Sequence, residues 1–361
     1  MSLISNIDIK TFRGIHSLRL DDLAQINVLT GNNNCGKTSI LEIIESFAAP
    51  ESFMTWRSLI RRGGGRILFD GISYYEGFYD LFDVNSTDKE IEYTMTMEGN
   101  TTKVLLSAQE VEEELTESQY YDIMGFVKNE EMSEDLSQIV SKLEMKIEID
   151  DKCVAQDSIY EEQSRFYSRD GMKPKKNIVY ISPFRHTEGM LFLGDVLNIP
   201  DLYEEMLGVL KEFDENILSI NYSNDDGRRR GVYKILSKSQ KKALPLNMYG
   251  DGMKKAILLM SAVIKAENGI LLLDEFETAI HTSAMDKVFR WILETCKKLN
   301  VQVFMTSHSK EAIEKILKCA PDIKNDIAVY TIYKDESGSS VRRLTAEKAI
   351  EVQDEMRLEL R

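Results

Sequence analysis

Residues 31–38 match the pattern GxxxxGK(S/T), and this motif constrains the fold more than any other feature of the chain. It follows a short apolar run, Ile26–Leu29, and leads into a helical pattern that begins at Ser39. A strand, a glycine-rich loop and a helix in this order form a phosphate-binding loop. The backbone N–H groups of such a loop turn toward a phosphate, and the positive end of the helix faces it. The sequence therefore predicts a nucleoside triphosphate site within an α/β fold.

The side chains of the motif have separate expected roles. We expect Lys37 to reach the terminal phosphates and to take part in catalysis, and Thr38 to hold Mg²⁺. The predicted cofactors are accordingly ATP and Mg²⁺. The residues of this loop that we expect to contact the nucleotide are Gly31, Asn32, Asn33, Asn34, Cys35, Gly36, Lys37, Thr38 and Ser39.

A second motif, far along the chain, supplies two carboxylates. Residues 269–273 form a continuous apolar run of the kind that makes a strand buried on both faces, and Asp274 and Glu275 follow it. Acids at the C-terminal tip of such a strand lie where ligands bind in open α/β sheets. We expect Asp274 to orient Mg²⁺ and Glu275 to activate the attacking water. Two acids that cap a helix are the alternative, and the presence of the Lys37 loop disfavours it.

Length and composition permit this interpretation. The chain has 361 residues, 43% of them hydrophobic, which allows one large α/β domain with insertions or two to three domains. It has no run of 18 or more apolar residues, and its first residues lack the basic and apolar regions of a signal peptide. We therefore expect a cytoplasmic protein without membrane contact. The four cysteines show no CxxC spacing, so neither a disulfide framework nor a zinc site is predicted.

The net charge of −15 argues against a surface that coats nucleic acid non-specifically, but the charge is uneven. Residues 101–150 hold 13 acidic and 4 basic side chains, a local net of −9, so the rest of the chain carries the remaining −6. Residues 221–245 hold seven Lys or Arg and two Asp, a local net of +5. This basic segment, with Arg228, Arg229 and Arg230, is the best candidate for DNA contact. A solvated hairpin tip is the alternative.

The N-terminal segments carry a resemblance to a known group of ATPases. Residues 7–15, with the sequence IDIKTFRGI, and residues 26–39 resemble the start of RecF, SMC and Rad50-like heads. Within that group they look most like the ATPase domains of the OLD (overcoming lysogenisation defect) family. The resemblance covers roughly residues 1–80 and 175–345. It implies an α/β fold, a P-loop NTPase head of the ABC type with an α+β insertion.

The resemblance divides the chain into three parts. Residues 1–84 would form the N-terminal part of the head, residues 85–175 an acidic insertion of strands and helices, and residues 176–361 the C-terminal part. Alternating apolar residues predict a hairpin over 88–108, and helical spacing predicts helices over 109–142. The acidic insertion is expected to be a solubilising face, with the docking of a basic partner protein as the alternative.

Position relative to the two motifs implies further site residues. Gly250, Asp251 and Gly252 precede an amphipathic helix and stand where ABC ATPases carry the signature loop, which contacts the nucleotide bound to the opposite subunit. The usual Ser-Gly-Gly core is replaced here, and a helix start capped by Asp251 is the alternative. His308, in Thr-Ser-His-Ser at the end of an apolar run, matches the switch histidine that senses the γ-phosphate and is expected to take part in catalysis.

Two further residues are weaker candidates. Arg185 follows the predicted strand 177–181 and is either a site residue or part of a structural ion pair. His281, which follows Glu277 beyond the acidic motif, is an interface candidate because ABC ATPases carry a dimer-contacting loop in that position.

The resemblance also implies a function. It predicts an ATP-hydrolysing ATPase that forms a homodimer or a higher homo-oligomer through its ATP sites and regulates a separately encoded effector, such as a nuclease, in bacterial defence against phage. We expect no TOPRIM nuclease domain, since the sequence ends at residue 361. The alternative is a DNA-repair or DNA-clamping ATPase whose residues Arg228 to Arg230 contact DNA phosphates. A nucleotide-binding scaffold without turnover is disfavoured because Glu275 is present.

Overall fold

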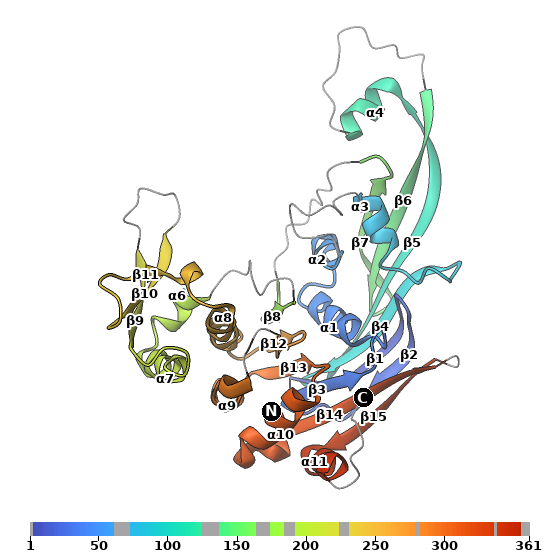
Figure 1. The fold of residues 1–361 in the computed structure, drawn as a ribbon. Coiled ribbons are helices and arrows are strands. Elements are labelled where there is room, and N and C mark those ends of the chain that lie inside the picture. The colour runs from blue at the N-terminus through green and yellow to red at the C-terminus, as the bar shows by residue number, and fades with distance from the viewer. Residues whose placement is uncertain are drawn as a thin grey trace.

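A six-stranded sheet forms the centre of the computed structural model (Figure 1). The structure describes residues 3–60, 73–124, 137–163, 174–183, 192–223, 231–278, 280, 282–335 and 338–354. In spatial order the strands of the central sheet are β15 (Gly338–Thr345), β14 (Ile327–Asp335), β3 (Ile26–Gly31), β13 (Gln302–Thr306), β12 (Ile270–Leu273) and β8 (Ile178–Ile181). All neighbouring pairs are parallel except β14 and β15. The carboxyl ends of the five parallel strands therefore meet at one edge.

Helices cover both faces of this sheet, which explains why β3, β12 and β13 read as continuous apolar runs. Successive side chains of β12 point to opposite faces. Leu271 and Leu273 belong to the core formed with α8, α9 and α10, whereas Ile270 and Leu272 belong to the core shared with α1. The described helices are α1 (Lys37–Ser46), α2 (Phe53–Ser58), α3 (Tyr74–Tyr79), α4 (Glu117–Met124), α6 (Leu193–Val196), α7 (Pro200–Leu210), α8 (Asp251–Lys265), α9 (Thr282–Lys298), α10 (Lys310–Cys319) and α11 (Ala346–Asp354).

A second, antiparallel sheet begins at the N-terminus and takes in the acidic segment. Its strands in spatial order are β2 (Ile15–Leu20), β1 (Ile4–Phe12), β4 (Lys89–Met97), β5 (Asn100–Thr116), β6 (Ser137–Ile149) and β7 (Lys152–Tyr160). Since β4 pairs with β1, the strands of the acidic segment continue the sheet that β1 and β2 start. Strands β5 and β6 extend away from the rest of the molecule, and α4 lies at their far end (Figure 1).

The prediction of helices over residues 109–142 is wrong for most of the described part of that segment. Strand β5 continues to Thr116, β6 begins at Ser137, and only α4 between them is helical. Val111 and Leu115 lie four residues apart. Two residues at this spacing lie on the same face of a helix and also on the same face of a strand. The glutamates between them, Glu112 to Glu114, alternate between more and less exposed positions. Alternation with a period of two is the pattern of a strand.

A three-stranded sheet with α6 and α7 forms a lobe on the other side of the molecule (Figure 1) and shares its core with α8 and α9. Its strands are β9 (Ile217–Ser223), β10 (Val232–Ser237) and β11 (Leu244–Pro245), followed by the 3-10 turn η1 (Leu246–Met248). Strands β9 and β10 pair as an antiparallel hairpin, as predicted. Helix α7 ends at Leu210, and the chain enters β9 at Ile217.

A buried glutamine is one of the links between the two larger sheets. The side chain of Gln302, at the start of β13, donates from Nε2 to the carbonyl oxygens of Ile4 (2.8 Å) and Ala24 (2.9 Å). Its Oε1 accepts from the backbone N–H of Ile4 at 2.8 Å. Gln302 is almost fully buried, so these hydrogen bonds form away from water. The amide thus acts as a backbone-like link between β1 and β13.

Replacement of this link should destabilise the protein. We expect Gln302→Met to lower the free energy of unfolding by about 2–4 kcal/mol, because it removes three hydrogen bonds from a buried position. Urea denaturation measures this change. Gln353→Met is the matched control: Gln353 is also buried, but within the described chain its amide atoms have no hydrogen-bond partner. An equal loss of stability in both variants would contradict the role assigned to Gln302.

Candidate functional site

The phosphate-binding loop connects β3 to α1 and depends on two glycines. Gly31 and Gly36 have φ angles of 141° and 102°, which side chains rarely adopt. A Cβ atom at Gly31 would also lie only 2.3 Å from the carbonyl oxygen of Ile332. The ammonium of Lys37 lies inside the loop and donates to the carbonyl oxygens of Gly31 and Asn32, both at 2.8 Å. The loop therefore holds a buried cation inside its own backbone turn, which is where the phosphate is predicted to bind.

Asp274 lies at the carboxyl end of β12 and is held by side chains from β13 and α1. The hydroxyl of Thr306, the last residue of β13, donates to Asp274 Oδ1 at 2.5 Å. The hydroxyl of Thr38 lies 3.0 Å from Asp274 Oδ2. Strand β13 stands between β3 and β12, so Thr306 at its end lies beside Asp274, while Thr38 reaches the same carboxylate from the start of α1. The parallel order of the sheet brings these three residues together.

These oxygen atoms fit a magnesium ion. Mg²⁺ prefers oxygen ligands and commonly uses one or two protein groups together with substrate phosphates and water. The Thr38 hydroxyl and the Asp274 carboxylate are the groups that would hold it, and the ion would supply positive charge to the phosphates when bound. Over the described ranges, no cluster of three or more His, Cys, Asp or Glu side chains offers a metal site made of protein alone.

Tyr180 is a further neighbour of Asp274. Its hydroxyl, which comes from β8, lies 3.3 Å from Asp274 Oδ2. Burial, and then the negative charge of Asp274, raise the pKa of Tyr180 well above its usual value. The phenol therefore stays protonated and can donate to the carboxylate.

Glu275 and His308 form a pair at the surface of the same edge. Glu275 has a φ angle of 47°, in the left-handed region, and its N–H donates to Thr306 Oγ1 at 2.9 Å. This backbone turn moves its side chain away from the sheet. His308 Nε2 lies 3.8 Å from Glu275 Oε1, and the two side chains are 40% and 42% exposed, respectively. The two residues predicted to act on the attacking water and the γ-phosphate therefore lie side by side and open to solvent.

Three further residues support this site: Thr306, Glu277 and Lys255. None of them was predicted to have a catalytic role. Thr306 binds Asp274 with its hydroxyl and holds the N–H of Glu275 with the same oxygen. Glu277 accepts three hydrogen bonds from the segment around His308. Lys255, on α8, is 1% exposed, and burial lowers the pKa of its ammonium to about 7, although three nearby carboxylates oppose that shift. Thr306 and Glu277 stand within the motifs that follow the two apolar runs, but no local pattern shows which groups these residues or Lys255 contact, because the partners lie on other elements.

The signature-like loop, residues 250–252, forms the start of α8. Gly250 is the N-cap residue of α8, with no side-chain cap, and Asp251 is the first residue of the helix and pairs with Lys254 at 2.6 Å. The alternative in which Asp251 caps the helix is therefore wrong. Within the part of the chain that the structure describes, no hydrogen bond or ion pair joins residues 250–252 to residues 31–39.

The structure does not describe five of the predicted residues. Arg185, His281, Arg228, Arg229 and Arg230 lie outside the described residues. Their predicted roles stay predictions.

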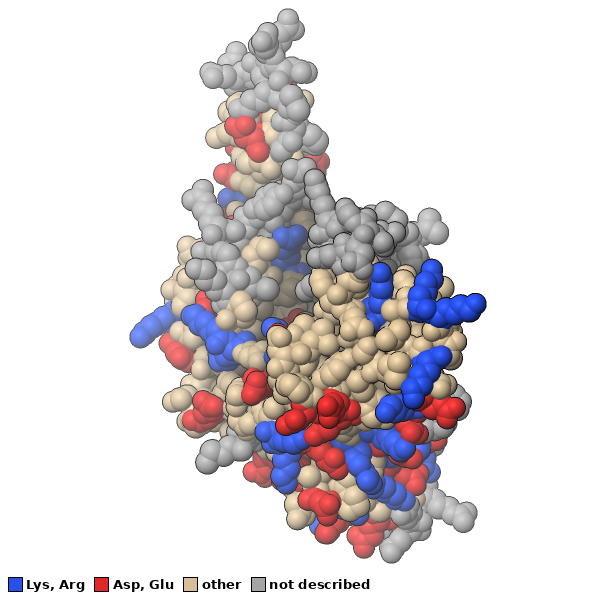
Figure 2. Space-filling view, turned by 90° about the vertical axis from the view of Figure 1, so that its left-hand side faces the viewer, with Lys and Arg blue, Asp and Glu red and all other residues tan. Residues whose placement is uncertain are grey.

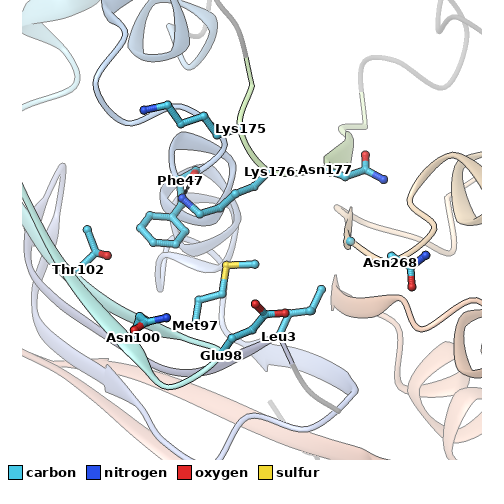
Figure 3. A pocket seen from close by; sticks show the side chains of 11 residues that line it. Leu3, Phe47, Met97, Glu98, Asn100, Thr102, Lys175, Lys176, Asn177 and Asn268 are labelled. Carbon is cyan, nitrogen blue, oxygen red and sulfur yellow. Dashed lines mark hydrogen bonds between the residues drawn. The ribbon is translucent and has the colours of Figure 1, made fainter.

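A cavity of about 370 Å³ lies at the opposite end of the strands (Figure 3). Asn177 and Gly269, which line it, precede β8 and β12, so the cavity is at the amino ends of these strands. Figure 3 shows Lys176 lying along Phe47, with its ammonium 3.8 Å from the centroid of the ring. Because nucleotides bind at the carboxyl ends of such strands, this cavity is not the predicted nucleotide site.

Comparisons with known protein families match two ATPase models that together span most of the chain. The model AAA_15, described as "AAA ATPase domain", matches residues 3–181. The model AAA_21, described as "AAA domain, putative AbiEii toxin, Type IV TA system", matches residues 159–314. Among the described helices, none is long and apolar enough to span a membrane.

Individual relatives and one solved structure agree with these models. An "ATP/GTP phosphatase" of Helicobacter pylori is 25% identical over 341 residues, which cover 86% of this chain and 87% of that protein. The uncharacterized protein MJECL11 of Methanocaldococcus jannaschii is 33% identical over 92 residues, 26% of this chain and 79% of that protein. An SMC head, solved with the C-winged helix domain of ScpA, has a TM-score of 0.53 at 11% identity and covers 97% of this chain and 100% of its own. This last similarity concerns the fold.

The shared hydroxyl of Thr306 gives a test of the site. We expect Thr306→Val to lower kcat for ATP hydrolysis by about 10–100-fold, because Asp274 and Glu275 both lose a group that orients them. ATP binding should persist, since the Lys37 loop is unchanged. Steady-state kinetics and nucleotide titration measure the two effects. Thr306→Ser, which keeps the hydroxyl, should stay within a few fold of wild type, and a Val variant with wild-type kcat would contradict the assignment.

Proposed function

Because the chain belongs to the same family as MJECL11 and is a RecF/SMC/Rad50-like P-loop ATPase with the ABC-type fold, we propose that ATP brings two copies of it together. Each nucleotide would then be enclosed between the Lys37 loop of one copy and residues 250–252 of the other. Two equivalent sites arise in this way from one symmetric contact.

The exposure of the catalytic pair is the observation that carries this proposal. Glu275 and His308 are 42% and 40% exposed. Efficient hydrolysis needs a site from which bulk water is excluded, and enzymes commonly obtain it by closing a second surface over the substrate. Within the described chain, residues 250–252 make no hydrogen bond or ion pair with the phosphate-binding loop. A second copy can supply that surface.

The conformation of Gly250 supports the same arrangement. Its φ and ψ angles of −63° and 154° suit any residue, and a Cβ atom there would meet nothing within 4 Å. The fold of a single copy therefore does not require glycine at this position. A glycine leaves the uncapped N–H groups at the start of α8 accessible to an approaching phosphate. The carboxylate of Asp251 would oppose such an approach, but its ion pair with Lys254 compensates the charge.

The surface beside this loop is suited to association. Figure 2 looks onto the side of the molecule that carries α7 and β9 to β11, and it shows a broad area without charged side chains. The exposed apolar residues of β9 and η1 are Leu218, Tyr222 and Met248. Met248 lies two residues before Gly250. Exposed apolar groups mark an interaction site where they form a contiguous patch, and a second copy would cover these three.

The residues of the assembled site would share the reaction as follows. Lys37 binds the terminal phosphates, and Thr38 and Asp274 hold Mg²⁺. Glu275 orients the attacking water and accepts its proton, while His308 contacts the γ-phosphate. Hydrolysis removes the group that bridges the two copies, so ATP binding favours association and turnover favours release.

We further propose that a separate effector protein reads this association. The resemblance of residues 7–15 and 26–39 to OLD-family ATPases is the basis for this step, since it implies an effector in bacterial defence against phage, for example a nuclease. In this role the ATPase acts as a sensor or regulator. The single and the associated forms of the ATPase would bind the effector with different affinities, and this difference would control the effector.

Clamping of DNA is the second candidate, and the charge of the β9–β11 lobe favours it. Lys234, Lys238, Lys241 and Lys242 lie on or directly after β10. Figure 2 shows Lys and Arg side chains along one side of the uncharged area. A protein that closes around DNA would bind it only with ATP, and the affinity would fall steeply with salt. DNA binding with these two properties would favour clamping over effector control.

The Glu275→Gln variant tests the association directly. It should bind ATP but not hydrolyse it, so we expect its mass in solution to double on addition of ATP and Mg²⁺. Light scattering coupled to size-exclusion chromatography measures the mass. Lys37→Ala is the control, and introduced into the Glu275→Gln chain it should abolish the increase. A mass that does not respond to nucleotide would remove the association switch from the proposal.

A further inference from the structure

One carboxylate binds the segment that carries His308. Oε1 of Glu277 accepts hydrogen bonds from Ser307 Oγ at 2.8 Å, from the N–H of His308 at 3.1 Å and from the N–H of Ser309 at 3.2 Å. Glu277 follows β12, whereas the residues that it binds follow β13. The parallel pairing of these two strands brings the segments together.

The local backbone favours a negative charge at this point. The N–H groups of His308 and Ser309 both point at Glu277, and successive N–H groups of this kind form a small anion site. Ser309 is also the N-cap of α10, and its side chain accepts from the N–H of Ala312 at 3.2 Å. The positive end of α10 therefore adds to the attraction. Hydrogen bonds to a charged acceptor are stronger than neutral ones, so this contact restrains the segment firmly.

We propose that Glu277 is a positioning residue for ATP hydrolysis: its carboxylate fixes the backbone of residues 307–309 and so holds the imidazole of His308 beside Glu275. The inference rests on the role given to His308 under the proposed function. Glu277 itself acts through the histidine and does not touch the reacting atoms. With Glu277 included, the site reaches from the tip of β12 to the start of α10.

The second carboxylate oxygen of Glu277 lies in a buried environment with a lysine nearby. Oε2 is buried and, among the residues that the structure describes, has no hydrogen-bond partner. A buried carboxylate is costly unless an opposite charge lies near it. Lys255 of α8 is 1% exposed, and Glu277 is the carboxylate that most raises the pKa of its ammonium against the effect of burial. Glu277 therefore acts electrostatically on a side chain of α8, the helix that begins at the signature-like loop.

Kinetics of Glu277→Ala test this role. We expect kcat to fall by about 10–100-fold while the Kd for ATP changes by less than about twofold, because the Lys37 loop is untouched. Glu277→Gln, which keeps an acceptor oxygen, should retain more activity than Glu277→Ala and serves as the main variant if Glu277→Ala does not fold. Glu311→Ala is the matched control, because Glu311 is an exposed acid in the first turn of α10 and should leave kcat unchanged.

A double-mutant cycle with His308→Ala separates positioning from general stability. If Glu277 acts through His308, Glu277→Ala or Glu277→Gln should cause no further loss of kcat in the His308→Ala chain. An equal loss in both backgrounds, or a wild-type kcat for Glu277→Ala, would overturn the inference and leave the role of His308 intact. Wild-type turnover by His308→Ala alone would overturn the proposed role of His308, and this inference with it. The two failures are therefore distinguishable.

Discussion

The hydroxyl of Thr306 is the contact on which the geometry of the site depends. It donates to Asp274 and accepts from the N–H of Glu275, so one oxygen atom orients the residue expected to hold the metal and the residue expected to activate water. Its position is set by the pairing of β12 with β13, in which Leu273 lies opposite Met305. A shift of this register by one residue would turn every side chain of β13 to the other face. The buried apolar strands thus determine where the chemistry can occur.

Those strands are also the part of the fold that the sequence predicted best. Continuous apolar runs gave β3, β12 and β13, and the glycine motif gave the loop before α1, because both signals are local. The segment 109–142 was predicted wrongly for a related reason. Val111 and Leu115 are compatible with helix or strand, and the pairing of β5 with β6 that decides between them is formed with residues far along the chain. Tertiary pairing overrode the local pattern.

The residues of the candidate site also divide into those that the sequence predicted and those whose role depends on tertiary contacts. Motifs in the sequence, and for His308 the resemblance to ABC ATPases, predicted Lys37, Thr38, Asp274, Glu275 and His308 as site residues. The parts taken by Thr306 and Glu277 could not be read from the sequence, because each acts on a residue that follows a different strand. The burial of Lys255 likewise depends on how α8 packs against the rest of the protein. Sequence reasoning therefore found the groups expected to meet the nucleotide and missed the groups that orient them.

The central claim is that two copies of the chain share each ATP site, and mixing two variants tests it most directly. Lys37→Ala removes the phosphate-binding cation, and Gly250→Val blocks the other surface at a position where a side chain meets nothing within one copy. Each variant alone should be nearly inactive. A mixed pair has one intact site, so an equimolar mixture should recover about a quarter of wild-type turnover. A mixture that is no more active than the separate variants would show that each copy hydrolyses ATP with its own residues alone.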